Sequence, residues 1–187
     1  GSIAGQADMN GSAFPGVTSP QDGGGTVAYI SDCQIETDRE AVIPDSYVSS
    51  AGEKLRLYRE LDSITDEERL ARFESQLTDR FGDIPTATHE LFDIVRLRWI
   101  CIRLGFEKAI VKNGIMILQF VHNQKSAYYK SELFGRILRV STRPGSKFIF
   151  RQNNNKLSVV VRSIKDIAAA AATLRELEVE AAKQPTA

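Results

Sequence analysis

The chain has 187 residues, which is room for one hydrophobic core of ordinary size and not comfortably for two. Its 24 Lys and Arg residues balance its 24 Asp and Glu residues, and 42% of its residues are hydrophobic, as in a folded globular domain. A zero net charge argues against a duplex-binding domain with a broad basic face. There is no apolar run of membrane-spanning length and no signal-peptide pattern, so we expect a cytoplasmic protein with no membrane partner.

Residues 1–26 are rich in Gly, Ser and Pro and have no apolar periodicity. We interpret them as a disordered linker that begins with the remnant of a tag. The folded domain is expected over residues 27–180, and residues 181–187 are expected to form a disordered tail.

Short alternating strands are predicted at residues 27–30 and 33–37, and a third apolar stretch, residues 41–43, ends before Pro44. Three helices are predicted next, over about 50–64, 65–81 and 85–104. Their ends are marked by capping boxes, glycine stops and a proline in the first turn of the third helix. These boundary residues are Ser50, Thr65, Gly82, Pro85 and Gly105.

The pattern then changes to a strand period. Residues 106–111 and 115–121 are rich in β-branched and aromatic side chains, and Asn113-Gly114 between them predicts a tight hairpin. A short amphipathic helix is predicted over residues 126–134.

Three further strands and a final helix complete the predicted elements. The strands are expected at residues 137–140, 147–151 and 157–162, with a polar asparagine turn over residues 152–155. Ser163-x-x-Asp166 then predicts a helix start. The fold class is therefore α+β: an N-terminal three-helix group, then an antiparallel sheet with two further helices packed on one face.

The two cysteines and two histidines do not indicate a metal site. Cys33 and Cys101 form no CxxC pair and have no histidine at ligand spacing, and Cys101 lies in an apolar helical run that predicts burial. His89 and His122 have no Cys, Asp or Glu partner at ligand spacing, so we expect both on the solvated surface.

No catalytic or cofactor-binding pattern stands out either. There is no nucleophile elbow and no complete phosphate loop. Carboxylates such as those of Glu53, Glu67 and Glu68 lie beside Lys or Arg and fit ordinary helical pairs. We therefore expect no catalysis and no cofactor in this chain.

One mild basic group lies in the second half of the chain and leaves two interpretations open. A solvated surface is favoured over contact with nucleic acid, because the background charge is neutral. The residues of this basic group are Arg136, Arg139, Arg143, Lys147 and Arg151.

Two constellations remain as candidates for a functional surface. In the first, residues 77–85, Leu77 and Phe81 are predicted to face the core while Asp79 and Arg80 project outward as an exposed charge pair. In the second, Asp93 and Arg96 are spaced to pair across one helical turn, and Trp99 is either a core residue, which we favour, or an interface anchor. 

These motifs resemble, in order and spacing, the C-terminal domain of bacterial transcription-repair coupling factors, the Mfd family. The similarity covers roughly residues 27–180 and is strongest through residue 105. The motifs are IPD at 43–45, KLxLYxxL at 54–61, LxDRFGxxP at 77–85, LxDxxRLR at 91–98 and LG at 104–105.

The resemblance implies a larger protein that translocates on duplex DNA, removes stalled RNA polymerase and recruits UvrA for nucleotide excision repair. ATP and Mg²⁺ would belong to its motor domains, outside this chain. The C-terminal domain would pack on the N-terminal module, mask its UvrA-binding surface and release it when polymerase is engaged. By resemblance, Asp79 and Arg80 are partner-binding residues, with Gln76 where relatives often carry glutamate. An accessory nucleic-acid contact is the alternative role.

Overall fold

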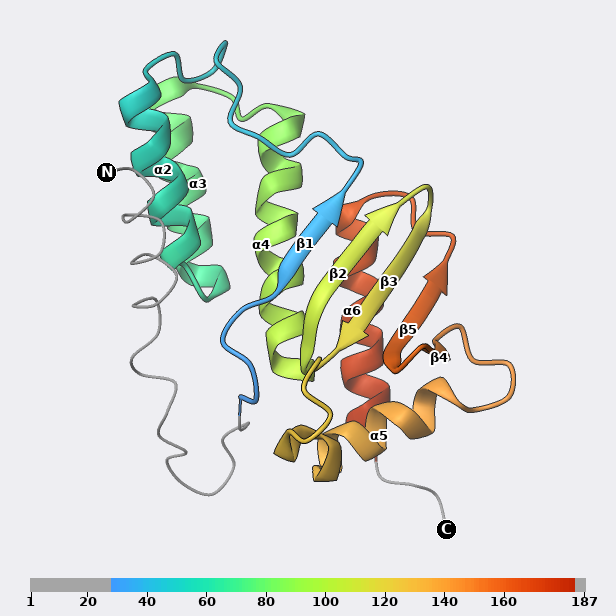
Figure 1. Cartoon of the computed structure of the whole chain (residues 1–187). Coiled ribbons are helices and arrows are strands. Elements are labelled where there is room, and N and C mark those ends of the chain that lie inside the picture. The colour runs from blue at the N-terminus through green and yellow to red at the C-terminus, as the bar shows by residue number, and fades with distance from the viewer. Residues whose placement is uncertain (1–27, 184–187) are drawn as a thin grey trace.

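The computed structural model describes residues 28–183 (Figure 1). The linker expected over 1–26 and the last residues of the expected tail, 184–187, lie outside the described part. The α+β class is confirmed. The elements in chain order are β1 (Gln34–Thr37), α2 (Ala51–Ser63), α3 (Glu67–Phe81), α4 (Thr86–Leu104), β2 (Phe106–Lys112), β3 (Ile115–Phe120), the 3₁₀ turn η1 (Ala127–Lys130), α5 (Glu132–Ser141), β4 (Ile149–Asn153), β5 (Lys156–Arg162) and α6 (Ile167–Ala182).

The sheet has the strand order β1-β2-β3-β5-β4 and is mixed, which corrects the antiparallel expectation. β1 pairs with β2 in parallel, and the other neighbours are antiparallel. The reason lies in the connection, because α2, α3 and α4 all intervene between β1 and β2. A crossover of that length allows parallel pairing, which a short turn forbids.

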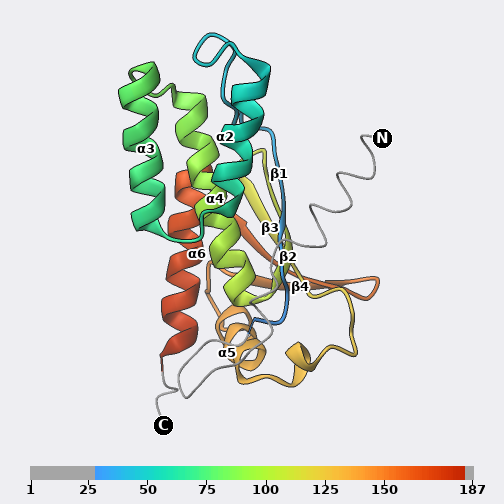
Figure 2. The same cartoon turned by 90° about the vertical axis from the view of Figure 1, so that its left-hand side faces the viewer.

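Helices cover one face of the sheet only. α4 and α6 run side by side behind the strands, and α5 lies across their lower end (Figure 1). α2 and α3 lie beside α4, beyond the β1 edge of the sheet (Figure 1), and among the described residues no helix covers the other face of the sheet (Figure 2). α4 therefore belongs both to the three-helix group and to the layer on the sheet.

The buried side chains form two hydrophobic clusters, where a single core was expected. The larger cluster fills the space between the sheet and helices α4, α5 and α6. The smaller cluster joins α2, α3 and the first half of α4. α4 supplies Phe92 and Val95 to the smaller cluster and Ile100 and Leu104 to the larger one. Its wide apolar face therefore connects the helical group to the sheet.

Both predicted tight turns between strands are present. Asn113 and Gly114 join β2 to β3 with φ of 54° and 73°, as a type I′ turn requires. Asn154 and Asn155 join β4 to β5 with φ of 48° and 65°. Asparagine tolerates positive φ better than other residues with a side chain, which explains this composition.

The predicted N-cap is correct for α2 and wrong for α3 and α6, and Pro85 is the N-cap of α4 and not a residue of its first turn. The Ser50 side chain accepts a hydrogen bond from the Glu53 amide, as predicted. For α3 and α6, however, the N-caps are Asp66 and Asp166, not Thr65 and Ser163. Each of these aspartates accepts a backbone N–H bond of 2.8 Å, and its negative charge favours the helix N-terminus.

Several other predicted boundaries were wrong. Residues 137–140 are part of helix α5, not a strand, because Ile137 and Val140 are spaced for one helix face and both are buried. Within the strand predicted at 27–30, the described residues 28–30 form no strand, and Tyr29 packs edge-on against Tyr128 at 5.5 Å. α6 continues to Ala182, two residues beyond its expected end.

The loop between β1 and α2 is tied to α4 by polar contacts, not by strand pairing at 41–43. The Thr88 hydroxyl donates to the Val42 carbonyl oxygen at 2.9 Å. The Arg39 Nε donates to the buried Glu90 carboxylate at 3.1 Å. These contacts place the loop against the start of α4, next to the corner between α3 and α4.

Candidate interaction surface

The corner between α3 and α4 is held by Tyr47, from the turn before α2. Its hydroxyl lies 2.8 Å from the Gly82 carbonyl oxygen and 3.2 Å from that of Leu77, so it can donate to either. Its ring packs on Phe81 with the centroids 5.8 Å apart, and burial raises the pKa of the Tyr47 hydroxyl. Gly82 has φ 86° and ψ −161°, a glycine conformation, though not the left-handed helical stop that was predicted. The corner is therefore a fixed part of the fold.

Arg80 points to α2 and does not pair with Asp79. Its guanidinium lies 2.6 Å from the Glu53 carboxylate and 4.8 Å from the centroid of the Phe81 ring. The expected Asp79–Arg80 charge pair is therefore replaced by a contact that joins α3 to α2. The predicted positions of Leu77 and Asp79 are correct, since Leu77 is buried and Asp79 is exposed.

Asp79 lies at the edge of a shallow hollow of about 360 Å³ between the end of α3 and the start of α4. The other lining residues are Glu74, Ser75, Thr78, Asp83, Ile84 and His89. His89 is exposed, as predicted, and its ring meets that of Phe92 edge-on at 5.9 Å. The hollow is open and mainly polar, so it is suited to contact with another polar surface.

Gln76 borders a second hollow, of about 260 Å³, between α2 and α3. It lies one turn before Asp79 and Arg80, and it shares the exposed side of α3 with Asp79. The exposed side chains spaced along this side are Glu68, Arg72, Gln76 and Asp79. We call these four residues the α3 outer stripe.

The α3 outer stripe carries both signs of charge and no large apolar side chain. Glu68 and Arg72 form an i,i+4 pair of 3.6 Å, and both are well exposed. Such a pair contributes well under about 1 kcal/mol to stability, so it can be exchanged for contacts to a partner at little cost.

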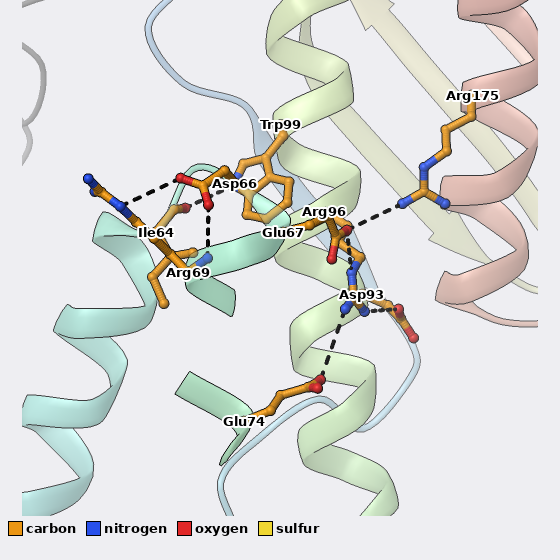
Figure 3. Close-up of polar contacts among 9 residues, drawn as sticks. All are labelled: Ile64, Asp66, Glu67, Arg69, Glu74, Asp93, Arg96, Trp99 and Arg175. Atoms are coloured by element: carbon orange, nitrogen blue, oxygen red, sulfur yellow. Dashed lines mark hydrogen bonds and ion pairs between the residues drawn. The ribbon is translucent and has the colours of Figure 1, made fainter. Parts of the chain in front are cut away.

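Arg96 of α4 contacts three carboxylates, two of which belong to α3 (Figure 3). It pairs with Asp93 at 3.0 Å, which confirms the predicted pair, and its Nε donates to Glu67 at 2.8 Å. Its other terminal nitrogen lies 4.0 Å from Glu74. Arg175 of α6 reaches Glu67 at 3.9 Å, so this Arg96 network also touches the sheet layer.

Glu67 was missed as a bridging residue by the sequence reasoning. Its position beside Glu68 and Arg69 predicts an ordinary helical pair, whereas its carboxylate points across to α4 and α6 (Figure 3). One sequence feature could have indicated its position. With Asp66 as the N-cap, Glu67 is the first residue of α3. No local pattern, however, says which neighbouring helix it meets.

Trp99 anchors the turn between α2 and α3. Its Nε1 donates to the Ile64 carbonyl oxygen at 2.9 Å, and its ring packs against the smaller hydrophobic cluster (Figure 3). Trp99 is partly buried and packs on this cluster, which favours the core interpretation. This contact and the Arg96 network hold the first half of α3 and the turn before it, while Arg80 holds its end.

Comparisons with known proteins agree on one family. The TRCF domain family matches residues 37–131, just over half of the chain. The chain belongs to the TRCF domain family. The matched region runs from the end of β1 through η1, and it contains the whole α3 outer stripe and, except for Arg175, the Arg96 network.

The curated relatives of this TRCF domain are much longer proteins. The transcription-repair-coupling factor of Rickettsia bellii is 31% identical over 116 residues, which is 58% of this chain and 10% of that protein. The protein of the same name from Staphylococcus epidermidis is 27% identical over 135 residues, which is 72% of this chain and 11% of that protein. The chain thus spans about a tenth of the length of these relatives.

A solved structure shares the fold. The crystal structure of the C-terminal domain of a transcription-repair coupling factor superimposes with a TM-score of 0.59 and 17% identity, covering 80% of this chain and 97% of that one. The TRCF domain described here therefore has the architecture of the domain at the C-terminal end of such proteins.

The basic group of the TRCF domain is interleaved with carboxylates. Arg136 pairs with Glu132 at 3.3 Å, on the same helix. From α6, Glu180 approaches Arg143 to 3.6 Å and Glu176 approaches Lys147 to 2.5 Å. Arg139 donates to a backbone carbonyl oxygen, that of Lys183. Within the described part of the chain, three of the five cations are thus paired with carboxylates and only Arg139 and Arg151 are not, which does not favour the alternative role as a nucleic-acid contact.

Two further findings concern sites that the sequence did not indicate. Over residues 28–183, no cluster of three or more His, Cys, Asp or Glu side chains has metal-binding geometry. None of the helices in that range is both long enough and apolar enough to cross a membrane.

Proposed function

We propose that this chain is a non-catalytic regulatory domain of a larger transcription-repair coupling factor, and that the α3 outer stripe docks on the N-terminal module of the same protein. In the docked state the domain masks the UvrA-binding surface of that module, and engagement of RNA polymerase releases it. ATP, Mg²⁺ and duplex DNA are handled by domains outside this chain. The translocation of the full protein on DNA is part of the same proposal.

The observation that carries the proposal is the fixed position of an exposed polar helix face. Arg80 ties α3 to α2, the Arg96 network ties it to α4, and Trp99 holds the turn before it. A helix held at both ends presents its outer side chains with little loss of conformational freedom on binding. The TRCF domain family match places this helix in a transcription-repair coupling factor.

The chemistry of the α3 outer stripe supports reversible docking. A masking contact must close the protein at rest and still be displaced, so its free energy has to stay at a few kcal/mol. Polar side chains that are already solvated meet that requirement, because undocking exposes no large apolar area. Asp79 lies on this stripe, and Gln76 supplies neutral hydrogen-bonding groups beside it.

The proposal is tested by measuring the affinity of the isolated domain for the separately produced N-terminal module. Asp79→Arg should weaken binding about tenfold or more, because it reverses a charge on the α3 outer stripe. Arg80 is a poor choice for this test, since its loss also breaks the contact with Glu53.

A matched control is Glu132→Arg on α5, whose carboxylate is 85% exposed and lies at the other end of the domain. It makes the same change in net charge and should leave the affinity unchanged. Equal affinities for the wild type and the Asp79→Arg variant would refute the assignment of the surface. Absence of any binding by the wild type would refute the docking itself.

A further inference from the structure

The uncovered face of the sheet carries an aliphatic row that crosses four strands. The cross-strand register aligns Ile110, Ile117, Val160 and Ile149, on β2, β3, β5 and β4. All four are partly exposed, whereas the inward-facing Ala109, Leu118 and Val159 in the adjacent row are fully buried. We call these four residues the aliphatic row.

A solvated sheet face normally carries polar side chains, so the aliphatic row is unusual. Ile115, 37% exposed, enlarges it toward the β2–β3 hairpin. The helices lie behind the strands in Figure 1 and mainly to one side of them in Figure 2, and no described element covers this face. Burial of such side chains by a partner lowers the free energy of the complex, because apolar surface is removed from water.

Cations border the aliphatic row on both sides. In the row toward the hairpin the register aligns Lys112, Ile115 and Arg162. The row on the other side contains Lys108, Gln119, Ser158 and Arg151. Glu36 of β1 aligns with Ile110, at the β1 end of the aliphatic row, and it pairs with Lys108 at 2.9 Å and with Lys112 at 3.7 Å.

The two arginines are available to a partner. Arg151 and Arg162 are exposed, and among residues 28–183 no carboxylate lies within 4.0 Å of either guanidinium. Arginine forms bidentate contacts with carboxylates, which makes this pair a recognition element for an acidic surface. The chain as a whole has no net charge, so the positive character is local to this face.

We propose that the uncovered sheet face, centred on the aliphatic row, binds an acidic amphipathic helix of a separate protein. The apolar side of that helix covers Ile117 and Val160, and its carboxylates pair with Arg151 and Arg162. A second copy of this chain is a poor occupant, because two such faces would oppose cation to cation. A nucleic acid is a poor occupant as well, since none of the three rows contains an aromatic side chain on which bases stack.

This face is distinct from the surface used for docking in the proposed function. α3 lies outside α4, on the far side of the α4–α6 layer from the sheet face (Figure 2). The sheet face therefore stays accessible when the α3 outer stripe is occupied, and the two surfaces can bind different partners at once. The inference does not depend on the docking of α3.

The test uses the whole chain and a fluorescent synthetic peptide of about 18 residues, long enough for five helical turns. The peptide carries leucines along one helical side and glutamates on the rest. A shuffled peptide of the same composition, with no apolar side, is the probe control. A single-stranded DNA of about 16 nucleotides represents the nucleic-acid class. Amide shifts in NMR spectra locate the site, and fluorescence anisotropy gives the affinity.

The amphipathic peptide should shift amides of β2, β3, β4 and β5 and leave those of α3 in place. The Ile117→Thr/Val160→Thr variant keeps β-branched side chains and should bind about tenfold more weakly. The Arg151→Glu/Arg162→Glu variant should bind the peptide at least about tenfold more weakly than the wild type. Its matched control is Arg59→Glu/Lys130→Glu, which reverses two exposed cations outside the sheet face and should bind like the wild type.

Three outcomes would overturn the inference. One is an absence of saturable shifts on the strands at about 1 mM peptide, the weakest affinity of practical interest. Another is equal binding by the two charge-reversed variants, which would show non-specific attraction. The third is tighter binding of the DNA than of the peptide to the same strands, with a steep salt dependence, which would assign the face to nucleic acid.

Discussion

Arg80 and Glu53 lie 2.6 Å apart, so a residue at the end of α3 is joined to the first turn of α2. The Glu53 carboxylate is largely covered, with 18% of its side chain exposed, whereas 54% of the Arg80 side chain is exposed. Within the 77–85 motif, Arg80 therefore stabilises the helical group and Asp79 faces solvent.

Replacing Arg80 by alanine should lower the free energy of unfolding by about 0.5–1 kcal/mol, because Glu53 loses its closest partner. Urea denaturation followed by circular dichroism measures the change. The control is Arg56→Ala, since Arg56 also pairs with Glu53, but at 3.8 Å and with 78% of its side chain exposed. Equal effects of the two substitutions would contradict a structural role specific to Arg80.

Replacing Arg96 by methionine should destabilise the domain by about 1–3 kcal/mol at neutral pH, because it leaves the Asp93 carboxylate without its partner. The control is Arg98→Met on the same helix. Both arginine side chains are 23% exposed, but Arg98 pairs with Asp62, which is 66% exposed. The control should change stability by less than about 0.5 kcal/mol.

The same site predicts a pH dependence. Burial raises the pKa of Asp93 above its ordinary value of 3.8, and Arg96 opposes that rise. The folded state therefore binds this proton more tightly than the unfolded chain, so the Asp93 contribution to stability falls as pH rises from 3.8 through the raised pKa. Without Arg96 the pKa rises further. The Arg96→Met variant should thus lose less free energy of unfolding, relative to the wild type, at about pH 4 than at about pH 7. A deficit independent of pH would contradict this account of Asp93.

Gly105 is expected to tolerate no side chain. Its φ is +88°, and an added Cβ would overlap the ring of Tyr128, whose hydroxyl donates to the Leu104 carbonyl oxygen at 2.7 Å. Gly105→Ala should lower the free energy of unfolding, measured by urea denaturation, by about 2–4 kcal/mol. Gly135→Ala is the matched control, because an added Cβ at this helical glycine meets nothing within 4 Å. That substitution should raise stability by about 0.5–1 kcal/mol, and a loss comparable to that of Gly105→Ala would contradict the packing argument.

The local elements of this domain were largely predictable from short patterns. Asn113-Gly114 fixes φ at two consecutive residues, so the hairpin follows from the sequence alone. Ser50 acts as predicted because a hydroxyl at an N-cap needs only its own helix. The strand predicted at 137–140 was wrong because a run of four residues is too short for its period to decide the element, and burial of Ile137 and Val140 on one side of α5 selected the helix.

The candidate surface was less predictable, because it depends on which helices become neighbours. Asp79 and Arg80 are adjacent in sequence, yet one faces solvent and the other reaches α2. Glu67 looked like part of a local pair, and only the packing of α3 against α4 and α6 brings it to Arg96. The parallel pairing of β1 with β2 could not be predicted from local sequence patterns either, because three helices separate the two strands in the chain.

If α3 of this domain masks the UvrA-binding surface, as we propose, the domain and UvrA must compete for the N-terminal module. UvrA is titrated onto the immobilised N-terminal module with and without an excess of this domain. The account predicts that the wild-type domain weakens the apparent affinity for UvrA in proportion to its concentration, and that the Asp79→Arg variant does so about tenfold less effectively. Simultaneous binding of UvrA and the wild-type domain to one module, with no loss of affinity, would contradict it.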